Sequence, residues 1–539
     1  MRATLFFLIT LPLSAQVSYE QILNADKTPE NWLTYSGGYM SQRYSLLNHL
    51  TPSNAGDLEL KWIYQAPSTD KYQATPLVKD GVMYVTAGPN DVLAIDAKTG
   101  RIFWKYEHDL PARVNPCCGR VNRGVALLDD MVYMAALDCR IIALDRLTGE
   151  KEWEQQVCNP SFGYALAHAP LAVKDKIIVG SAGGEFGIKG WLAAYDAKTG
   201  EQAWKFNNIP DPGEPGHETW ENDAWKTGGG SIWLTGSYDP DLNLTYWGVG
   251  NPAPDWNPDV RPGDNLYTDS AIALDMDTGK LKWHFQFTPH DEWDWDAVQI
   301  PVLADLEYKG KMRKLMLWAN RNAFYYILDR ETGEFLDAKQ FVKQTWAKEI
   351  DKNGVPIKIP GMGPSEKGSL TFPGVQGGTN WYSPSLSLST GLFYFSVWEN
   401  YSSMYYKWEQ QYEPGTRYLG GAPKSEVPAT RRNEPDVRDV DTGNGAVRAM
   451  DPLTGEVVWE YETDEVSDSG MLTTASDLLF TGNREGHFSA FNAKTGDLLW
   501  RKYLGGQIAA SPMTYSVDGK QYVSIAAGHA LFTFGLKED

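Results

Sequence analysis

The sequence predicts an all-β fold, an eight-bladed β-propeller with tryptophan-docking repeats, and two observations support this prediction. The first is a recurring segment of the form Ala-x-Asp-x-x-Thr-Gly-x-x-x-Trp, as in AIDAKTGRIFW, AYDAKTGEQAW and ALDMDTGKLKW. The second is the composition, since 21 Trp, 28 Tyr and 51 Gly in 539 residues suit short strands and tight turns rather than long helices. A chain of this length needs several domains or one large closed repeat, and the repeat favours the second.

Eight Thr-Gly pairs set the expected number of blades. In each repeat the Asp and the Thr-Gly pair form a hairpin turn, where Gly accepts the positive φ that a β-branched residue resists. The tryptophan that follows is expected to pack between neighbouring sheets, although two copies lack it (Thr332 and Thr390). The pairs begin at Thr99, Thr148, Thr199, Thr278, Thr332, Thr390, Thr454 and Thr495.

Closure of the ring requires a strand from outside the repeats. Residues 58–66 (LELKWIYQA) have the pattern of an outer strand and precede every Thr-Gly turn. We expect this segment to complete the sheet formed by the last repeat, because a closed ring protects the sheet edges.

The N-terminus has the pattern of an export signal. A basic Met1-Arg2 precedes an apolar run over residues 3–13 and a small-residue site at Ser14-Ala15-Gln16. The run is too short for a permanent anchor, and no later stretch is long and apolar enough to span a bilayer. We therefore expect a signal peptide over 1–15, a single propeller domain over 16–539 and a periplasmic protein that is not an integral membrane protein. A buried N-terminal strand is the alternative.

The charge limits the choice of partners. The formal net charge of −20 argues against nucleic acid or an anionic membrane surface, because a polyanion would be repelled. A cationic protein partner stays open.

Four cysteines in an exported chain suggest two disulfides, with three connectivities. Cys139 and Cys158 bracket a strand and a turn, so a bond between them would staple the outer strands of one blade. Cys117 and Cys118 are adjacent and can bond only in a strained eight-membered ring, which would then be a functional candidate. The crossed pairing, Cys117 with Cys158 and Cys118 with Cys139, stays open.

Several motifs outside the repeat resemble those of one enzyme family. They are CCGRVNRG (117–124), GGEFG (183–187), YWGVGNPAPDWNP (246–258), TPHDEWDWD (288–296) and NRNAFYYILD (320–329). With the tryptophan repeat, they make nearly the whole mature chain similar to PQQ-dependent (quinoprotein) alcohol dehydrogenases of the methanol and ethanol dehydrogenase type. The resemblance implies pyrroloquinoline quinone (PQQ) and one metal ion at the centre of the propeller, and a bond between Cys117 and Cys118.

The expected metal ligands are Glu185, Asn251, Asp294 and Asp296. They come from three blades and are the hard oxygen ligands that Ca²⁺ and similar cations require, although any one carboxylate alone is more simply a solvated surface charge. The resemblance gives Asp294 a second role, as the base that removes the alcohol proton. It also links Asp296 to the lanthanide-dependent branch, because calcium enzymes usually carry an uncharged residue there. We expect a lanthanide, otherwise Ca²⁺, unless Asp296 merely points to solvent.

The cofactor is flat and carries three carboxylates, so its site needs an apolar sandwich and a polar rim. The resemblance places the cysteine ring on one face and Trp233 on the other, where a blade-packing tryptophan is the alternative interpretation. Arg321 is expected at the reactive quinone oxygens. The implied cofactor-binding residues are Gln73, Cys117, Cys118, Arg123, Ser231, Trp233, Asn380 and Trp381.

The chain departs from the family pattern at several rim positions. Gln73 stands where relatives commonly carry Glu, and Ala167 and Ala182 stand where hydroxyl side chains are common. An aromatic residue that often lines the substrate cavity is missing near residues 468–470. The resemblance therefore does not fix the cofactor affinity or the size of the substrate.

The resemblance implies oxidation of a small alcohol to an aldehyde. Asp294 would take the hydroxyl proton, and a hydride would pass to a quinone carbon whose carbonyl Arg321 and the metal polarise. The sequence has no Cys-x-x-Cys-His haem motif, so we expect a separate soluble c-type cytochrome as electron acceptor. Whether the chain forms a homodimer stays open.

Two other functions are compatible with the repeat. One is a non-catalytic propeller scaffold, since a fold alone does not fix function. The adjacent cysteines, the acidic set and the arginines disfavour it, because blade packing needs none of them. The other is a quinoprotein dehydrogenase for sugars or polyols.

Overall fold

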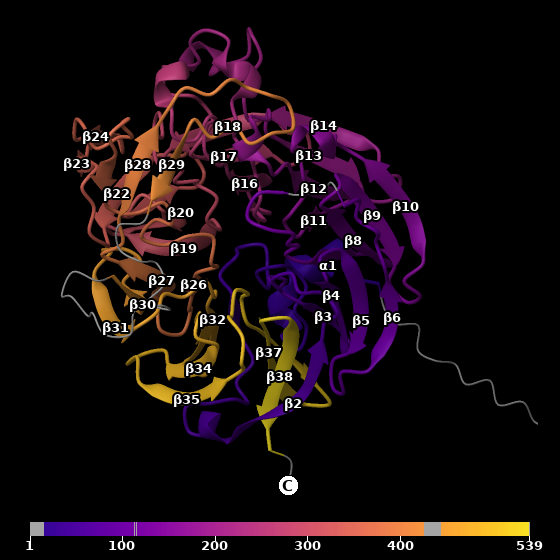
Figure 1. Ribbon diagram of the computed structural model, residues 1–539. Coiled ribbons are helices and arrows are strands. Elements are labelled where there is room, and N and C mark those ends of the chain that lie inside the picture. The colour runs from indigo at the N-terminus through magenta and orange to yellow at the C-terminus, as the bar shows by residue number, and fades with distance from the viewer. Residues whose placement is uncertain (1–15, 113, 115, 425–442, 538–539) are drawn as a thin grey trace, which may run out of the picture.

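The strands are arranged radially around a central axis (Figure 1). The computed structural model describes residues 16–112, 114, 116–424 and 443–537, so the expected signal peptide over 1–15 lies outside the described residues. Within those ranges the chain forms eight blades, which confirms the predicted fold class.

The first five blades are each built from four consecutive antiparallel strands, and the first strand of each lies nearest the axis (Figure 1). These strands are β3 (Leu77–Lys79), β4 (Val82–Ala87), β5 (Asp91–Asp96), β6 (Ile102–Tyr106); β7 (Val125–Leu128), β8 (Met131–Ala136), β9 (Arg140–Asp145), β10 (Lys151–Gln156); β11 (Leu171–Val173), β12 (Lys176–Gly180), β13 (Trp191–Asp196), β14 (Gln202–Asn207); β15 (Ser237–Asp239), β16 (Leu244–Gly248), β17 (Ser270–Asp275), β18 (Leu281–Gln286); and β19 (Val302–Tyr308), β20 (Lys311–Ala319), β21 (Phe324–Asp329), β22 (Phe335–Gln340).

The last three blades recruit strands from elsewhere in the chain. Blade six has a long insert between its second and third strands, blade seven gains a parallel inner strand, β1, and blade eight takes its outer strand, β2, from near the N-terminus. The strands are β26 (Ser385–Leu386), β27 (Phe393–Glu399), β30 (Asn444–Met450), β31 (Val457–Thr463); β1 (Tyr44–Ser45), β32 (Leu472–Thr474), β33 (Leu478–Gly482), β34 (His487–Asn492), β35 (Leu498–Tyr503); and β36 (Met513–Val517), β37 (Lys520–Ala527), β38 (Ala530–Leu536), β2 (Leu58–Gln65).

Short elements decorate the ring. Two small sheets lie in the long connections of blades five and six, and the helices are single turns or little more. They are β23 (Ala347–Ile350), β24 (Pro356–Lys358), β25 (Ser369–Thr371), β28 (Ser403–Lys407), β29 (Gly421–Lys424), α1 (Tyr19–Leu23), and the 3-10 helices η1 (Ala25–Lys27), η2 (Ala55–Asp57), η3 (Pro160–Phe162), η4 (Gly184–Phe186), η5 (His217–Thr219), η6 (Ala224–Thr227) and η7 (Pro258–Val260). Among the described residues, every helix is too short to cross a bilayer.

Seven of the eight Thr-Gly pairs join the third and fourth strands of a blade, as predicted, but Thr390 does not. Thr390 lies in the turn between β26 and β27, inside the blade whose outer turn holds Thr454. The eighth blade has no such turn, because its third and fourth strands, β38 and β2, come from opposite ends of the chain. The predicted number of eight blades was therefore correct, although the prediction that Thr390 marks a blade of its own was wrong.

The segment 58–66 closes the ring, but onto a different sheet from the one predicted. β2 pairs antiparallel with β38, with Leu58 opposite Leu536, so indigo and yellow strands lie side by side in Figure 1. It thus completes the sheet of the C-terminal strands rather than the sheet of the Thr495 repeat, because three further strands follow that repeat.

The repeat tryptophans fasten each blade to the next. The indole Nε1 of Trp104 donates to the Arg146 carbonyl at 3.0 Å, and its ring covers Gly149, where a Cβ would lie 2.5 Å from the indole. Only glycine permits this contact in the positive-φ turn. The same pair of contacts joins Trp62 to Gly100, Trp153 to Gly200, Trp204 to Gly279, Trp283 to Gly333 and Trp459 to Gly496. Between blades five and six the side chain of Lys339 covers Gly455 instead.

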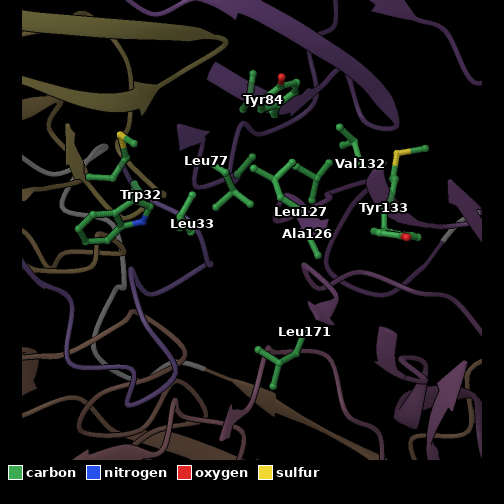
Figure 2. Packing of buried hydrophobic residues seen from close by; sticks show 14 of the residues in the cluster. Trp32, Leu33, Leu77, Tyr84, Ala126, Leu127, Val132, Tyr133 and Leu171 are labelled. Atoms are coloured by element: carbon green, nitrogen blue, oxygen red, sulfur yellow. The ribbon is translucent and has the colours of Figure 1, made fainter. Parts of the chain in front are cut away.

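Apolar side chains fill the space between neighbouring blades. Figure 2 shows Leu77 and Tyr84 of the first blade, Leu127 and Val132 of the second and Leu171 of the third in one buried cluster. This packing makes a rigid ring, which holds the loops at its centre in fixed positions.

Candidate active site

The predicted site residues meet on one face of the ring because of the strand order. Successive strands of a blade run in opposite directions, so the loops that follow every second and every fourth strand emerge on the same face. Glu185, Asn251 and Arg321 follow second strands, whereas Trp233 and Asp294 lie in loops that follow fourth strands. Residues far apart in the sequence are thereby brought to the axis.

The local sequence anchors the loop that carries Asp294 and Asp296. In the segment EWDWD the two tryptophans stack on each other at 4.6 Å and are buried, with Trp295 Nε1 donating to the Gly374 carbonyl at 3.0 Å. The Asp291 carboxylate caps this turn by accepting from the backbone N–H groups of Trp293 and Trp295. The stacked tryptophans and the Asp291 cap anchor this loop, and both carboxylates face Arg321.

Arg321 lies against both aspartates. Its Nη1 donates to Asp296 Oδ2 at 2.6 Å, and its Nη2 lies 3.9 Å from Asp294 Oδ2. The same guanidinium also donates to the Val375 carbonyl. The arginine thus holds the two carboxylates in one place and leaves Asp294 the less tightly paired of the two.

Asp294 has the properties of a general base. Burial is the main reason why its pKa is raised well above the ordinary value, opposed by Arg321 and assisted by Asp296, Asp255 and Glu185. Its backbone is in the left-handed region (φ 63°), which is unfavourable for a non-glycine residue and concentrated at functional sites. A carboxylate with a raised pKa accepts a proton more readily.

Two glycines let the expected metal ligands approach one another around Ser231. A Cβ on Gly184 would lie 3.1 Å from Asn251 Oδ1 and 3.2 Å from Ser231 Oγ. A Cβ on Gly250 would overlap Asp296 Oδ1, which also accepts from the Asn251 N–H at 3.0 Å. These glycines therefore keep open a space bounded by oxygen atoms.

Cys117 and Cys118 lie over Glu185, and their sulfurs are within 4.8 Å of a Glu185 carboxylate oxygen. Among the described residues no other three His, Cys, Asp or Glu side chains are this close, so Glu185, Asp294 and Asp296 surround the site at wider spacing. The cysteines are free, with sulfurs 2.8 Å apart, which differs from the expected bonded ring. A bond of about 2.05 Å would require the distorted peptide of the eight-membered ring, which the structure has not formed.

The other two cysteines are bonded to each other. The Cys139–Cys158 disulfide links the turn before β9 to the second residue after β10, as expected for a staple between the outer strands of one blade. This bond is incompatible with the crossed pairing.

Several of the expected cofactor residues lie against one another. The Arg123 guanidinium lies between Trp233 and Trp381, 5.0 Å and 4.7 Å from their ring centroids. Ala167 and Ala182 pack with Trp233 in one apolar cluster, so the hydroxyl contacts missing there are replaced by apolar surface. The Asn380 Oδ1 accepts from the Trp381 N–H at 2.8 Å, which fixes the amide beside this tryptophan.

Several polar atoms of the expected site residues lack hydrogen-bond partners among the described residues. The Gln73 Oε1 and the Nε atoms of Arg123 and Arg321 are buried without a hydrogen-bond partner among the described residues. Buried polar groups are almost always paired in folded proteins, so this concentration points to a ligand that would complete them.

Sequence reasoning missed two buried carboxylates near the site, Asp255 and Asp269. Both are fully buried, and none of their four oxygens has a hydrogen-bond partner among the described residues. Burial raises the pKa of Asp255 well above its ordinary value, and the charges of Glu185 and Asp296 raise it further. The available signal was an acidic residue inside the apolar, proline-rich segment NPAPDWNP.

The position of the missing aromatic is occupied by an ion pair. Asp468 accepts from Arg484 Nε at 2.8 Å and from the Gln507 amide, and Arg484 lies 4.6 Å from the Trp398 centroid. A charged cluster has therefore replaced an apolar wall at this edge.

Comparison with known proteins agrees with this geometry. The family profile described as "PQQ: Glucose/ethanol/alcohol dehydrogenase, beta-propeller domain" matches residues 32–338 and 462–523. The chain is similar to the quinoprotein alcohol dehydrogenase PedH of Pseudomonas putida, with 40% identity over 95% of this chain and 89% of that protein. A quinoprotein ethanol dehydrogenase of Pseudomonas putida is 36% identical over 95% of this chain and 88% of that protein.

Solved structures of related enzymes share the fold. The quinohemoprotein alcohol dehydrogenase ADHIIG of Pseudomonas putida HK5 matches with a TM-score of 0.91 and 35% identity over 98% of this chain and 83% of that chain. A europium-containing methanol dehydrogenase matches with a TM-score of 0.89 and 33% identity over 96% of this chain and the whole of that chain. These relatives contradict the alternative of a non-catalytic scaffold. The chain belongs to the family of PQQ-dependent quinoprotein alcohol dehydrogenases, which are oxidoreductases acting on CH–OH groups.

Proposed function

We propose that this enzyme oxidises a small alcohol to an aldehyde in the periplasm, with a lanthanide ion beside the quinone and a separate c-type cytochrome as electron acceptor. The observation that carries the proposal is the group formed by the half-buried Asp294 with the buried Asp296 and Arg321. This group combines a base, an extra negative charge and a cation in contact with both.

The described residues fit the two groups that the family implies. Glu185, Asn251, Asp294 and Asp296 would hold the metal in the space that Gly184 and Gly250 leave open. Trp233, Trp381 and Arg123 would supply the apolar faces and the cationic edge that a flat tricarboxylate needs. When bound, the quinone accepts a hydride and the metal acts as a Lewis acid.

The chain's own residues carry out the proton transfer. The alcohol hydroxyl gives its proton to the Asp294 carboxylate while its α-carbon loses a hydride, so an aldehyde results. Arg321 keeps Asp294 oriented and stabilises its charged form before the transfer. The stacked Trp293–Trp295 pair is buried on either side of Asp294 in the sequence and adds low-polarity surroundings, which strengthen electrostatic interactions.

Charge matching supports a trivalent ion. Glu185, Asp294 and Asp296 supply three formal negative charges around the site, which neutralise a 3+ ion and leave surplus repulsion around a 2+ ion. One solved relative at 33% identity is a europium-containing enzyme, which adds to this support.

The export pattern of residues 1–15 supports the periplasmic location, and the sequence has no haem attachment motif. The acceptor of the two electrons is therefore proposed to be a separate soluble cytochrome. The net charge of −20 favours a cationic surface on that partner.

Reconstitution tests the proposal directly. Metal-stripped protein is supplied with PQQ and either La³⁺ or Ca²⁺, and dye-linked oxidation of short alcohols, sugars and polyols is measured. We expect activity only when quinone and metal are both present, with more activity from La³⁺ and with short alcohols as the best substrates. Full activity with Ca²⁺ alone, or a preference for sugars, would contradict the respective part of the proposal.

A further inference from the structure

Asp255 is a buried acid that neither the fold nor the proposed reaction accounts for. It lies four residues after Asn251, in the loop between β16 and η7. Its side chain is fully buried, and among the described residues neither oxygen has a hydrogen bond of ordinary geometry. An ionised carboxylate in such a place is strongly unfavourable unless another charge compensates it. The Asp255 carboxylate therefore requires a cation nearby.

Arg261 is the nearby cation, but its donors are used elsewhere. Its Nε donates to the Pro254 carbonyl at 3.0 Å, its Nη1 to Asn265 Oδ1 at 3.0 Å, and its Nη2 to the Asp291 and Asp255 backbone carbonyls at 2.6 Å and 3.2 Å. None of these bonds reaches the Asp255 carboxylate. The arginine fixes the loop and compensates the acid only through space, without a hydrogen bond to its carboxylate.

The surroundings of Asp255 are acidic. It interacts electrostatically with Glu185, Asp296 and Asp294, which are the expected metal ligands, and with the side chain of Asn251. The wider buried cluster has six carboxylates, Glu185, Asp255, Asp269, Asp291, Asp294 and Asp296, and two guanidinium groups, Arg261 and Arg321. Two further cations, Arg417 and Lys358, act on Glu185 and Asp291, and carboxylates still outnumber the cations in this group.

We propose that Asp255 is a positioning residue of the metal site, which orients the Asn251 amide and supplies a further negative charge that favours a trivalent over a divalent ion. This inference rests on the metal site of the proposed function. A residue behind the ligands acts on the metal in this way when it fixes a ligand and adds to its field. The attraction to a 3+ ion is one and a half times that to a 2+ ion at the same place, so the residue discriminates between them.

Asp255→Asn removes the charge while keeping the shape of the side chain. We expect Tb³⁺ affinity to fall roughly 100-fold and Ca²⁺ affinity about 20-fold, following the ratio of the ionic charges. We also expect the metal-free variant to melt at a higher temperature than the metal-free wild type, because a buried repulsion has been relieved. A merely structural residue would give the opposite change in melting temperature.

The test uses the full chain with PQQ, stripped of metal and titrated with Tb³⁺, whose luminescence the buried tryptophans sensitise, and with Ca²⁺ in competition. Asp259→Asn is the matched control, because Asp259 lies four residues further on, in η7, but is exposed and pairs with Lys407 at 2.6 Å. It should change neither affinity. Asp255→Ser, a second neutral variant, should reproduce the selective loss and guards against an effect peculiar to Asn.

The outcomes distinguish the proposed metal site from the proposed role of Asp255. Wild-type protein that binds neither ion would overturn the proposed metal site and this inference with it. Tight Tb³⁺ binding by the wild type together with unchanged binding by Asp255→Asn would overturn the role of Asp255 alone. Equal losses for both ions, with a lower melting temperature of the metal-free variant, would make Asp255 a structural residue.

Discussion

The rim of the propeller and its centre treat polar groups in opposite ways. At the rim, the docked tryptophans donate their indole N–H to the next blade, as Trp283 does to the Arg330 carbonyl at 3.1 Å, and the turn carboxylates accept from their own backbone, as Asp275 does from Thr278. At the centre, Asp255, Asp269 and Gln73 have buried oxygens that lack a hydrogen-bond partner of ordinary geometry within the part of the chain that the structure describes. The rim is satisfied by the chain itself, whereas the centre is arranged to be satisfied by something that binds to it.

A change at the centre should remove activity and leave the fold intact. We expect Asp294→Asn to lower the rate of alcohol oxidation roughly 10³-fold, about 4 kcal/mol in activation free energy, because the amide cannot accept the proton. The melting temperature should fall little or rise, since one of several mutually repelling carboxylates becomes neutral. Dye-linked assays and thermal melting of the reconstituted protein measure both. A variant that keeps a tenth of the wild-type rate would show that another group is the base.

A change at the rim should do the reverse. Trp283→Ala removes a buried indole and its hydrogen bond, and we expect the free energy of unfolding to fall by about 3 kcal/mol while the rate per folded molecule is unchanged. Lys339→Ala is the matched control, because Lys339 covers Gly455 at the one joint between Thr-Gly blades that lacks a tryptophan. It is exposed and should cost under about 1 kcal/mol. Urea unfolding of both variants makes the comparison, and equal losses would show that the tryptophans add nothing special to blade docking.

The same contrast explains what the sequence could predict. The rim follows from a local repeat, so the number of blades and the closing strand were readable from the Asp, Thr-Gly and Trp spacing. Thr390 misled because a Thr-Gly turn serves any hairpin and does not say which strands it joins. The sheet that β2 completes was missed because nothing in 58–66 specifies its partner.

The centre was readable only where a motif carried the family resemblance, as with Glu185 and the EWDWD segment. Asp255 and Asp269 gave no periodic signal, and their meaning depends on burial, which follows from how separate loops converge. The state of Cys117 and Cys118 was equally beyond the sequence, because a strained ring forms or stays open according to its surroundings and to oxidation.

His168 sharpens the comparison, since it is buried near the centre yet satisfied like the rim. Its Nδ1 donates to the Ala169 carbonyl and its Nε2 accepts from the Gly180 N–H, both at 2.8 Å, and its ring packs edge-on against Trp247. This arrangement fixes one neutral tautomer, because a proton on Nε2 would face the Gly180 N–H. Burial is the main cause that lowers the pKa of His168 to about 4.

The folded-state pKa lies below the unfolded value of about 6.5, so between these values the unfolded chain binds a proton that the folded protein does not. This residue's contribution to stability is therefore complete above about pH 6.5 and is lost as the pH falls toward 4, by about 2–3 kcal/mol. His168→Gln replaces the titrating ring with a neutral amide and should be less stable than wild type at pH 7, with a difference that narrows toward pH 4. Urea unfolding of both proteins from pH 7 to pH 4 measures this difference and cancels the titration of the carboxylates that they share. Parallel pH profiles would mean that His168 is protonated in the folded state and that its two hydrogen bonds do not hold it neutral.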